Sequence, residues 1–381
     1  MVNTAFYNNG RPFQRCTRCV MDTSDIGIEF DSAGICSCCK NYELLMANKA
    51  PLSISRDKEL ADKIALIKKE GQGKDYDCII GVSGGVDSTY VAYLCKQLGL
   101  RPLAVHLDNG WNTELAVSNI EKCMKGLGVD LYTHVLDWDS FKDMQLAFLR
   151  AATPDSEFPT DHAIISLMNQ KALEVGVRFV ITGVNLATEG IVGTPMGASC
   201  FDWKYISHIH KTFGTIKIAK NFPKMSLIKH FYCRYIKKIE TMYILNYVDF
   251  NKQNAVELMK EKLNWQPYTG KHHESIYTRF FQSYILPRRH GFDKRTMHLS
   301  TLIMSGQMER DTALRELESK ICPDDIVRQD KEYIAKKLGI SQTDLENILD
   351  LRPRQNSEFP SYEKTWYLKL FRKFKKGIYD K

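Results

Sequence analysis

The feature that most constrains this chain is a regular alternation of short apolar runs and helical patterns between residues 77 and 182. Four apolar runs, at 78–82, 102–107, 131–136 and 178–182, have the length and composition of buried strands. The stretches 88–98, 114–126, 140–152 and 161–175 lie between them and carry apolar residues at helical spacing. Strands that alternate with such helices form a parallel sheet with right-handed crossovers. We therefore predict an α/β fold with helices flanking the sheet.

One loop in this pattern predicts an anion site. Residues 83–88, with the sequence SGGVDS, follow the first strand directly and open a helix. The glycines allow the backbone to approach a ligand, and a helix N-terminus offers free N–H groups and the positive end of a dipole. Asp87 would repel phosphate unless a cation lay between them, which indicates Mg²⁺. The loop matches neither the GxxxxGK[ST] phosphate loop nor the GxGxxG dinucleotide motif.

Two later strand ends are expected at the same edge of the sheet. The segment HLDNGWN (106–112) follows the second strand, and TGVNLATE (182–189) follows the fourth. Ligands of open parallel sheets bind outside the carboxyl ends of the strands, so both segments should meet the SGGVDS loop at one crevice. Asp108 is a candidate nucleotide contact, with an ordinary Asx turn as the alternative.

The N-terminal segment predicts a metal site. Five of the eleven cysteines lie between residues 16 and 39. The pairs Cys16/Cys19 and Cys36/Cys39 are CxxC motifs separated by 16 residues, which is within the ~15–20 residues of zinc ribbons. We predict a structural Zn²⁺ on these four thiolates. A CxC pair that uses Cys38, or a redox dithiol, is the alternative, and the six scattered cysteines are expected to be buried thiols.

Charge and hydropathy exclude several classes of protein. The net charge of +8 suits phosphate-bearing small molecules without requiring nucleic acid. No apolar run reaches the roughly 18 residues of a membrane span, and the polar opening lacks the apolar region of a signal peptide. A cytoplasmic location is therefore expected.

Residues 265–312 are dense in cations, histidines and aromatic side chains. One group comprises Lys271, His272, His273, Glu274 and Arg279, and a second comprises Arg288, Arg289, Asp293, Lys294, Arg295 and His298. The metalloprotease motif HExxH is absent. Three interpretations stay open: a solvated basic surface over an aromatic core, an RNA-binding patch, and a pocket for a sugar nucleotide and its pyrophosphate.

The composition along the chain divides it into three predicted parts. Residues 1–45 form a zinc-ribbon-like module, 46–220 form the sheet domain, and 221–381 form a mainly helical region that completes the substrate site. The tail 362–381 carries seven Lys or Arg residues and two acidic ones, interleaved with aromatic residues. It is expected to be an amphipathic helix packed on its own domain, with contact to a membrane surface or a partner as the alternative.

The SGGVDS loop in this context resembles the PP-loop ATP pyrophosphatase superfamily, which implies cleavage of ATP to AMP and pyrophosphate. The CxxC pairs, SGGVDS, HLDNGWN, TGVNLATEG, DWKYI and the run KHHES…TRFFQ…YILP…DKR…HLS…SGQ occur together and in order. This combination resembles the N-acetyl sugar amidotransferase family (WbpG-type) of bacterial surface-polysaccharide and lipopolysaccharide O-antigen pathways. The resemblance extends from Cys16 to about Leu351.

The resemblance implies a reaction and its partners. An N-acetyl group of a nucleotide-linked sugar is adenylated on its amide oxygen, and ammonia then replaces the AMP to give an acetamidino group. The sequence shows no nucleophilic cysteine in a glutaminase context. The family implies that ammonia comes from a separate glutaminase subunit (HisH-like), with a cyclase-like (HisF-like) protein as a possible second partner. No nucleic acid partner is expected.

The resemblance also implies residue roles. Phosphates of ATP are assigned to Ser83, Gly84, Gly85, Val86, Asp87 and Ser88, with His106, Asp108 and Gly183 at the nucleotide. Asp87 and Glu189 are expected to bind Mg²⁺. From residue type and position, Lys294 and Arg295 are candidates for neutralising the pyrophosphate or the adenylate. Lys271 is the further catalytic candidate, and His272, His273, Glu274 and Arg279 are the candidate substrate contacts.

Two alternatives of different kinds remain. A PP-loop tRNA thiolase would need sulfur-carrying cysteines in the site, and Cys200 is the one scattered cysteine near the expected cleft. A non-catalytic zinc-ribbon protein, binding nucleic acid or serving as a scaffold, would tolerate a degenerate ATP loop. The intact SGGVDS motif argues against that interpretation.

Overall fold

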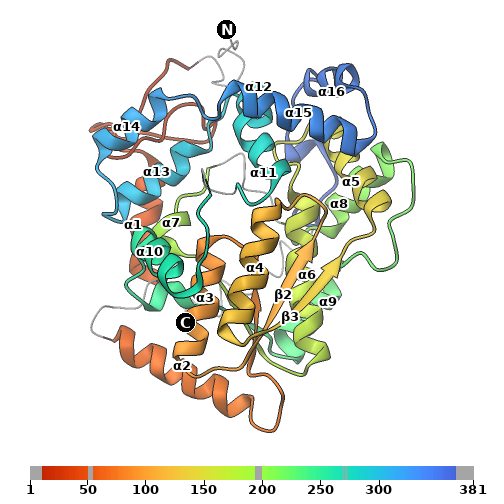
Figure 1. Ribbon diagram of the computed structural model, residues 1–381. Helices are drawn as coiled ribbons and strands as arrows, with labels where there is room; N and C mark the ends of the chain where they lie inside the picture. Colours follow the sequence, from red (N-terminus) through yellow and green to blue (C-terminus); the bar gives the residue numbers. More distant parts are fainter. Residues whose placement is uncertain (1–10, 50–54, 194–199, 269, 271–272, 366–381) are drawn as a thin grey trace.

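A five-stranded parallel sheet forms the centre of the protein (Figure 1). The computed structural model describes residues 11–49, 55–193, 200–268, 270 and 273–365. The strands are β1 (Cys78–Gly81), β2 (Pro102–Asp108), β3 (Asp130–Val135), β4 (Phe179–Thr182) and β5 (Glu240–Tyr243). Their order across the sheet is β3-β2-β1-β4-β5, with every neighbouring pair parallel. The predicted α/β class is confirmed.

Helices cover both faces of the sheet because neighbouring strand residues point to opposite sides. Cys78 and Ile80 belong to a core with α3 (Val86–Gln97) and α4 (Glu114–Leu127), whereas Ile79 belongs to a core with α5 (Trp138–Ala151) and α6 (Phe158–Glu174). The strands β1, β2 and β4 are buried and read as continuous apolar runs, which is why the sequence revealed them, whereas β3 at the sheet edge has no buried residue. The helix α2 (Arg56–Glu70) packs in the first of these cores.

The fifth strand was not predicted. It lies beyond residue 220, where we expected the sheet domain to end, and it pairs with β4 in the register Phe179↔Glu240 to Thr182↔Tyr243. Its sequence is ETMY and only one of its four residues is buried, so the segment lacks the apolar run that marks β1, β2 and β4. The sheet therefore draws its edge from the region we had assigned to the C-terminal part.

The C-terminal region is helical, as predicted, and wraps around the carboxyl edge of the sheet. Its elements are α10 (Lys252–Leu263), α11 (Ile276–Phe280), η5 (Phe281–Ile285), α12 (Leu286–His290), α13 (Arg295–Met304), α14 (Arg310–Glu318), α15 (Asp324–Leu338) and α16 (Gln342–Leu349), followed by the short turns η6 (Asn356–Glu358) and η7 (Tyr362–Lys364). Preceding them are α7 (Leu186–Glu189), α8 (Trp203–Phe213), α9 (Leu227–Phe231), η3 (Tyr232–Ile236) and η4 (Ile244–Tyr247). Most of the predicted tail helix, residues 366–381, lies outside the described residues.

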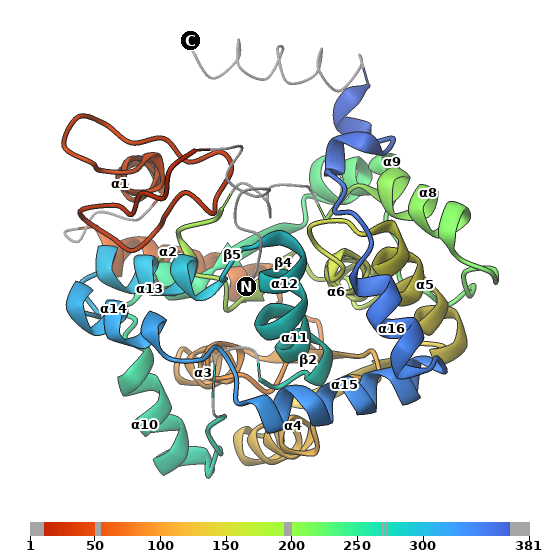
Figure 2. The same ribbon diagram turned by 90° about the horizontal axis from the view of Figure 1, so that it is seen from above.

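The N-terminal cysteine segment and α1 (Ser37–Lys49) form a separate small layer. Seen from above, they lie beside α13 and α14, at the opposite side of the molecule from α15 and α16 (Figure 2). In the part of the chain that the structure describes, no helix is long and apolar enough to cross a membrane.

Candidate functional site

The SGGVDS loop joins the carboxyl end of β1 to the first turn of α3, as its sequence predicts. Gly85 is the N-cap of α3 and has no side chain to occupy the helix N-terminus. The Ser88 hydroxyl accepts a hydrogen bond from the Ser83 amide at 3.2 Å and donates one to the Gly85 carbonyl at 3.0 Å. These bonds fold the loop back on the helix end. The result is a small cradle with a positive dipole end, suited to a phosphate.

The loop is held from outside by a segment that sequence reasoning had not connected with it. The Gly84 carbonyl accepts hydrogen bonds from the Trp265 indole at 2.9 Å and the Tyr268 hydroxyl at 3.0 Å. Gly84 has a φ of +85°, and a Cβ there would lie 2.8 Å from the carbonyl oxygen of Ala116. The loop conformation therefore requires glycine at this position, and the C-terminal region fixes its carbonyl.

Glu274 lies against the same loop. A Cβ built on Gly85 would be 3.3 Å from a carboxylate oxygen of Glu274. The Glu274 carbonyl accepts from the amide of Thr113 at 2.9 Å, so the chain around Glu274 runs beside the segment that follows β2. The structure thus brings a predicted substrate residue to the predicted phosphate loop, although the two are far apart in sequence.

His106 is bonded to the protein through both ring nitrogens. Its Nδ1 is 2.9 Å from the Val82 carbonyl, and its Nε2 is 3.0 Å from the Asn112 amide nitrogen. Burial lowers the pKa of His106, which favours the neutral ring with Nδ1–H donating and Nε2 accepting. Because both ring nitrogens bond to the protein, His106 ties the ends of β1 and β2 together. Its predicted place at the nucleotide stays a prediction.

The other two strand-end residues frame the loop. Asp108 accepts a hydrogen bond from the Gly110 amide at 2.8 Å, which is the Asx turn that we had kept as an alternative. At the end of β4, a Cβ on Gly183 would lie 3.1 Å from the carbonyl carbon of Asp87. Only a glycine allows β4 to approach the first turn of α3 so closely.

A group of carboxylates lies near Lys294, and no motif in the sequence marks it. Burial and the nearby charges of Asp155, Glu157 and Glu189 raise the pKa of Asp161 to about 8, while Lys294 opposes the shift. Burial likewise raises the pKa of Asp155, again against Lys294. We call Asp155, Glu157, Asp161, Glu189 and Lys294 the Lys294 group. The Asp161 side chain is itself exposed to solvent.

The members of the Lys294 group come from four elements. Asp155 and Glu157 precede α6, Asp161 lies in its first turn, Glu189 ends α7, and Lys294 is the N-cap of α13. The helices α7 and α13 are tied together, since the Ser305 hydroxyl donates to the Ala187 carbonyl at 2.8 Å. Glu157 also accepts from the Thr278 hydroxyl of α11 at 2.5 Å. In sequence, Asp161 is indistinguishable from any acidic residue that begins a helix.

Two of the predicted cationic residues form ion pairs and hydrogen bonds with other groups of the protein. Arg279 makes a two-pronged ion pair with buried Asp330 at 2.6 and 2.8 Å, which joins α11 to α15. Arg295 pairs with Asp293 at 2.8 Å and donates to the carbonyl of Glu316 at 2.9 Å, at the end of α14. These guanidinium groups hold helices together, and their predicted roles toward substrate and phosphate stay predictions.

The remaining predicted substrate residues are only partly placed. Lys271 and His272 lie outside the described residues. The His273 ring packs on Gly270, where a Cβ would come within 2.7 Å of the imidazole. Phe280 and Phe281 are buried, as the aromatic-core interpretation of this segment predicts.

The four cysteines of the two CxxC motifs converge in the N-terminal module. Among the described residues, the sulfur atoms of Cys16, Cys19, Cys36 and Cys39 are all buried and lie within 4.8 Å of one another. Cys38 is not part of this group. Three of the S···S distances are 3.9, 3.6 and 3.6 Å. Tetrahedral Zn²⁺ with Zn–S bonds of ~2.3 Å separates its sulfurs by about 3.8 Å, so the cluster has the dimensions of a zinc site.

The surroundings of Cys16 favour its thiolate. The amides of Arg18, Cys19 and Cys36 approach the Cys16 sulfur at 3.4, 3.5 and 3.3 Å. The Cys19 side chain, followed by Cys39 and the Cys19 amide, lowers the pKa of Cys16 to about 6, against Cys36 and burial. Hydrogen bonds among the four thiols also lower the pKa of Cys36 and raise the pKa values of Cys19 and Cys39. Zinc binding requires all four to be deprotonated, and the charge of the bound ion would stabilise the thiolates.

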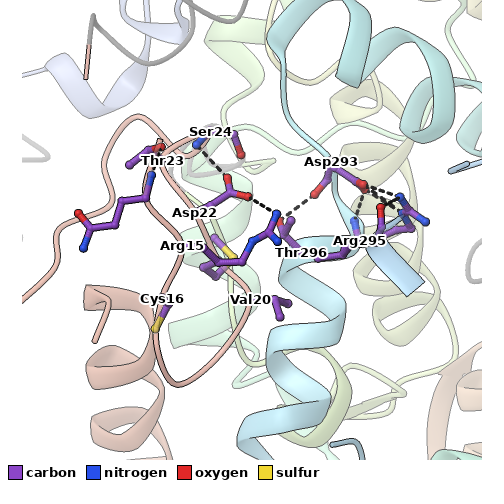
Figure 3. Close-up of polar contacts among 12 residues, drawn as sticks. Arg15, Cys16, Val20, Asp22, Thr23, Ser24, Asp293, Arg295 and Thr296 are labelled. Carbon is purple, nitrogen blue, oxygen red and sulfur yellow. Dashed lines mark hydrogen bonds and ion pairs between the residues drawn. The ribbon is translucent and has the colours of Figure 1, made fainter. Parts of the chain in front are cut away.

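The cysteine module is hydrogen-bonded to α13, whose N-cap is Lys294, and to the next helix, α14. Arg310 of α14 donates to the carbonyls of Cys16 at 2.9 Å and Cys19 at 3.1 Å. The Val20 amide donates to the Ser300 hydroxyl of α13 at 3.1 Å. Figure 3 shows the loop with Val20 and the Arg15–Asp22 ion pair lying beside the first turns of α13. Val20 packs with Leu299 and Ala313 in a small shared core.

Two family matches cover separate parts of the chain. Residues 60–153, which hold the SGGVDS loop, match the NAD synthase family. Residues 274–375 match the family described as LPS biosynthesis protein WbpG-like, C-terminal domain. Together the two matches support a WbpG-type member of the PP-loop superfamily. The WbpG-like match begins at Glu274, which lies beside the phosphate loop.

Solved structures with a partial likeness include three proteins of low identity. A predicted subunit of tRNA methyltransferase from Methanocaldococcus jannaschii is 16% identical, with a TM-score of 0.29, over 48% of this chain and 76% of that one. The NH3-dependent NAD synthetase from Campylobacter jejuni is 16% identical, with a TM-score of 0.28, over 57% and 99%. The NMN synthetase from Francisella tularensis is 14% identical, with a TM-score of 0.27, over 58% and 90%. TM-scores of this size do not distinguish one activity from another. Comparison with curated proteins gave no significant match.

Proposed function

We propose that this PP-loop enzyme converts an N-acetyl group of a nucleotide-linked sugar into an acetamidino group, using ATP and ammonia. ATP loses pyrophosphate, and its AMP moiety becomes attached to the amide oxygen. Ammonia then attacks the activated carbon, and AMP leaves with the oxygen. The product carries C=NH where the substrate carried C=O. The reaction would serve the synthesis of a bacterial surface polysaccharide in the cytoplasm.

The observation that carries this proposal is that Glu274, the first residue of the WbpG-like match, lies against Gly85 of the phosphate loop. Trp265 and Tyr268, which come before the matched region, hydrogen-bond to the Gly84 carbonyl. A loop suited to phosphate and a family-specific segment therefore border the same space. Adenylation of a substrate requires this arrangement, because the α-phosphate and the amide oxygen must meet.

Two groups of this site would serve the chemistry. Lys294 is the cation near the carboxylates of α6 and α7, and it would offset the negative charge that develops on the phosphates. Asp87 and Glu189 are the candidate ligands for Mg²⁺, which would supply further positive charge when bound. The four buried cysteines would hold a structural Zn²⁺.

Ammonia would come from a separate glutaminase subunit, with a cyclase-like protein as a further partner. The amide oxygen of an N-acetyl group is a poor leaving group, whereas AMP is a good one. Water competes with ammonia for the adenylate, so delivery from a bound partner would favour the amidine.

The experiment that tests the proposal supplies ammonium directly and so bypasses the partner. Purified protein is incubated with ATP, Mg²⁺, ammonium chloride and a panel of nucleotide-linked N-acetyl sugars, and AMP and pyrophosphate are followed. We expect AMP formation that depends on one sugar, with mass spectrometry showing replacement of O by NH. Parallel reactions contain bulk tRNA, and AMP formation that depends on tRNA would replace this proposal with a thiolase.

One observation weighs against the thiolase. Sulfur transfer needs a reactive thiolate, and burial raises the pKa of Cys200 to about 12. Its carbonyl accepts from the His162 ring at 2.7 Å, which fixes this part of the chain.

The zinc assignment has its own test. We expect one zinc per chain by elemental analysis, and chelation should destabilise the protein by several kcal/mol, on the order expected for a metal that organises a small module. Cys38→Ser serves as the control and should retain the metal, whereas Cys36→Ser should lose it. Full stability without zinc would contradict a structural role.

A further inference from the structure

One continuous segment holds an unusual share of the positive charge. Residues 203–239 contain nine Lys or Arg residues and no Asp or Glu, in a chain whose total net charge is +8. Eight of the nine are exposed: Lys204, Lys211, Lys217, Lys220, Lys224, Arg234, Lys237 and Lys238. The function proposed above uses none of them. The rest of the chain, taken together, is close to neutral, so the segment forms a local cationic surface.

The same segment also turns an apolar stripe toward solvent. The consecutive helices α9 and η3 expose Ile228 by 83%, Phe231 by 46%, Tyr232 by 41%, Tyr235 by 43% and Ile236 by 62%. These positions follow the i, i+3, i+4, i+7, i+8 spacing of one helix face. In a soluble helix this face ordinarily points into the core, and here it is exposed. Apolar surface grouped in this way marks an interaction site.

The segment is nevertheless anchored to the protein. Cys233, Met225 and Ile239 are buried beneath the exposed stripe. The ring of Phe201, which precedes α8, lies 4.8 Å from that of His230 in α9. The stripe is therefore presented on a fixed support.

The last described residues, up to Thr365, lie beside this surface. Asp202, the N-cap of α8, accepts hydrogen bonds from the Ser361 hydroxyl at 2.5 Å and the Tyr362 amide at 2.8 Å. Figure 2 shows the end of the described chain next to α8 and α9. Residues 362–381 add seven Lys or Arg residues against two acidic ones. Residues 203–239 and 362–381 are both cationic, so they repel each other, and an anionic partner would be attracted to both.

We propose that α9 and η3, with the basic residues of 203–239 around them, form a docking surface for a membrane that contains anionic lipid. Isoleucine and aromatic side chains would enter the boundary between headgroups and acyl chains, while Lys and Arg pair with lipid phosphates. An RNA partner would satisfy the cations and offer stacking to the aromatic rings, but it has nothing to cover Ile228 and Ile236. A second copy of this chain would bring an equally cationic face.

Vesicle flotation with the full chain tests this. We expect binding to phosphatidylcholine vesicles that contain 30% phosphatidylglycerol, roughly tenfold weaker binding to pure phosphatidylcholine, and a progressive loss as salt rises from 0.05 to 0.5 M. Absence of binding to the anionic vesicles at low salt would overturn the proposal.

Two double variants locate the surface. Lys229→Glu/Lys237→Glu should weaken binding at least about tenfold, since each cation near the surface contributes roughly fivefold. Ile228→Ser/Ile236→Ser should weaken it by a similar factor without changing net charge. The matched controls are Lys122→Glu/Lys125→Glu on α4 and Leu66→Ser/Val117→Ser on α2 and α4, which are exposed elsewhere and should bind normally.

The remaining outcomes count against the proposal. Binding that survives Ile228→Ser/Ile236→Ser, or falls equally in the controls, would place the contact elsewhere. If the protein does not bind vesicles, two other results would assign the surface to a different partner. One is RNA binding in a gel-shift assay that is lost in the variants. The other is dimerisation, measured by light scattering, that is lost in the variants. Circular dichroism verifies that each variant is folded, so a misfolded protein is not scored.

Discussion

The phosphate loop and the Lys294 group lie at the same edge of the sheet but are built in opposite ways. The loop is one run of six residues between a strand and a helix, and it organises itself through Ser83, Gly85 and Ser88. The Lys294 group consists of side chains from positions 155 to 294. Asp155, Glu157 and Asp161 lie together at the start of α6, whereas Glu189 and Lys294 come from elements far along the chain. A local motif can be read from sequence, whereas the assembled group exists only after folding.

The difference predicts separable roles. Variants in the loop should affect ATP binding, because its glycines and amides form the cradle. Variants in the Lys294 group should affect turnover more than ATP binding, because a charge that stabilises the transition state need not hold the ground state. The predictions below test this separation.

Replacement of Lys294 should have the largest effect. Lys294→Ala removes the cation of the group, and we expect AMP formation to fall by roughly 10²–10³-fold, as for loss of one electrostatic contact to a developing charge. The Kd for ATP, measured by calorimetry, should change much less. Lys320→Ala, in an exposed position, is the control. Near-normal turnover of Lys294→Ala would remove this residue from the site.

Gly84→Ala tests the phosphate loop, which is the other half of the comparison. The φ of +85° and the 2.8 Å approach to the Ala116 carbonyl oxygen leave no room for a methyl group. We expect ATP binding to weaken on the order of 100-fold, as for a misplacement of about 1 Å. Gly176→Ala is the matched control, since its φ is +72° with nothing within 4 Å of the added carbon. It should cost about 1 kcal/mol of stability and leave ATP binding unchanged.

Arg310 tests whether the cysteine module supports the Lys294 group. Arg310→Ala removes two hydrogen bonds to the carbonyls of Cys16 and Cys19 and should lower the free energy of unfolding by about 1–3 kcal/mol. Hydrogen exchange measured by mass spectrometry should increase in α13 and α14 but not in α15 or α16. Arg315→Ala on the same helix loses only a bond to Thr312 and serves as the control. Equal hydrogen exchange in the two variants would mean that the cysteine module does not support the Lys294 group.

The smallest effect is a change in the pH dependence of stability. The folded-state pKa of Asp161 is about 8, above its ordinary 3.8, because of burial and the charges of Asp155, Glu157 and Glu189, against Lys294. The folded protein therefore binds this proton more tightly than the unfolded chain, and stability should decline as pH rises from about 4 to 8. Asp161→Asn cannot titrate and should decline less. Urea unfolding at pH 5 and pH 9 measures the difference, and parallel curves for the two proteins would contradict it.

The sequence alone was sufficient to predict features built from residues that lie close together in the chain. Buried strands appear as apolar runs, a phosphate turn as glycines between a strand and a helix, and a metal module as two CxxC pairs at a fixed spacing. β5 was missed because its four residues, ETMY, contain no apolar run, and it becomes a strand by pairing with β4. β3 was predicted although none of its residues is buried, because the alternation of strands and helices on either side marked its place.

Only the tertiary structure decided which side chains remain available in the C-terminal region. Arg279, Arg295 and Lys294 have the same charge in sequence, but Asp330 and Asp293 engage the two arginines, whereas Lys294 faces the carboxylates of α6 and α7. Trp265 and Tyr268 likewise became part of the phosphate loop through contacts across about 180 residues. Residue type and local spacing determine what a side chain can do, and long-range packing determines which partners it meets.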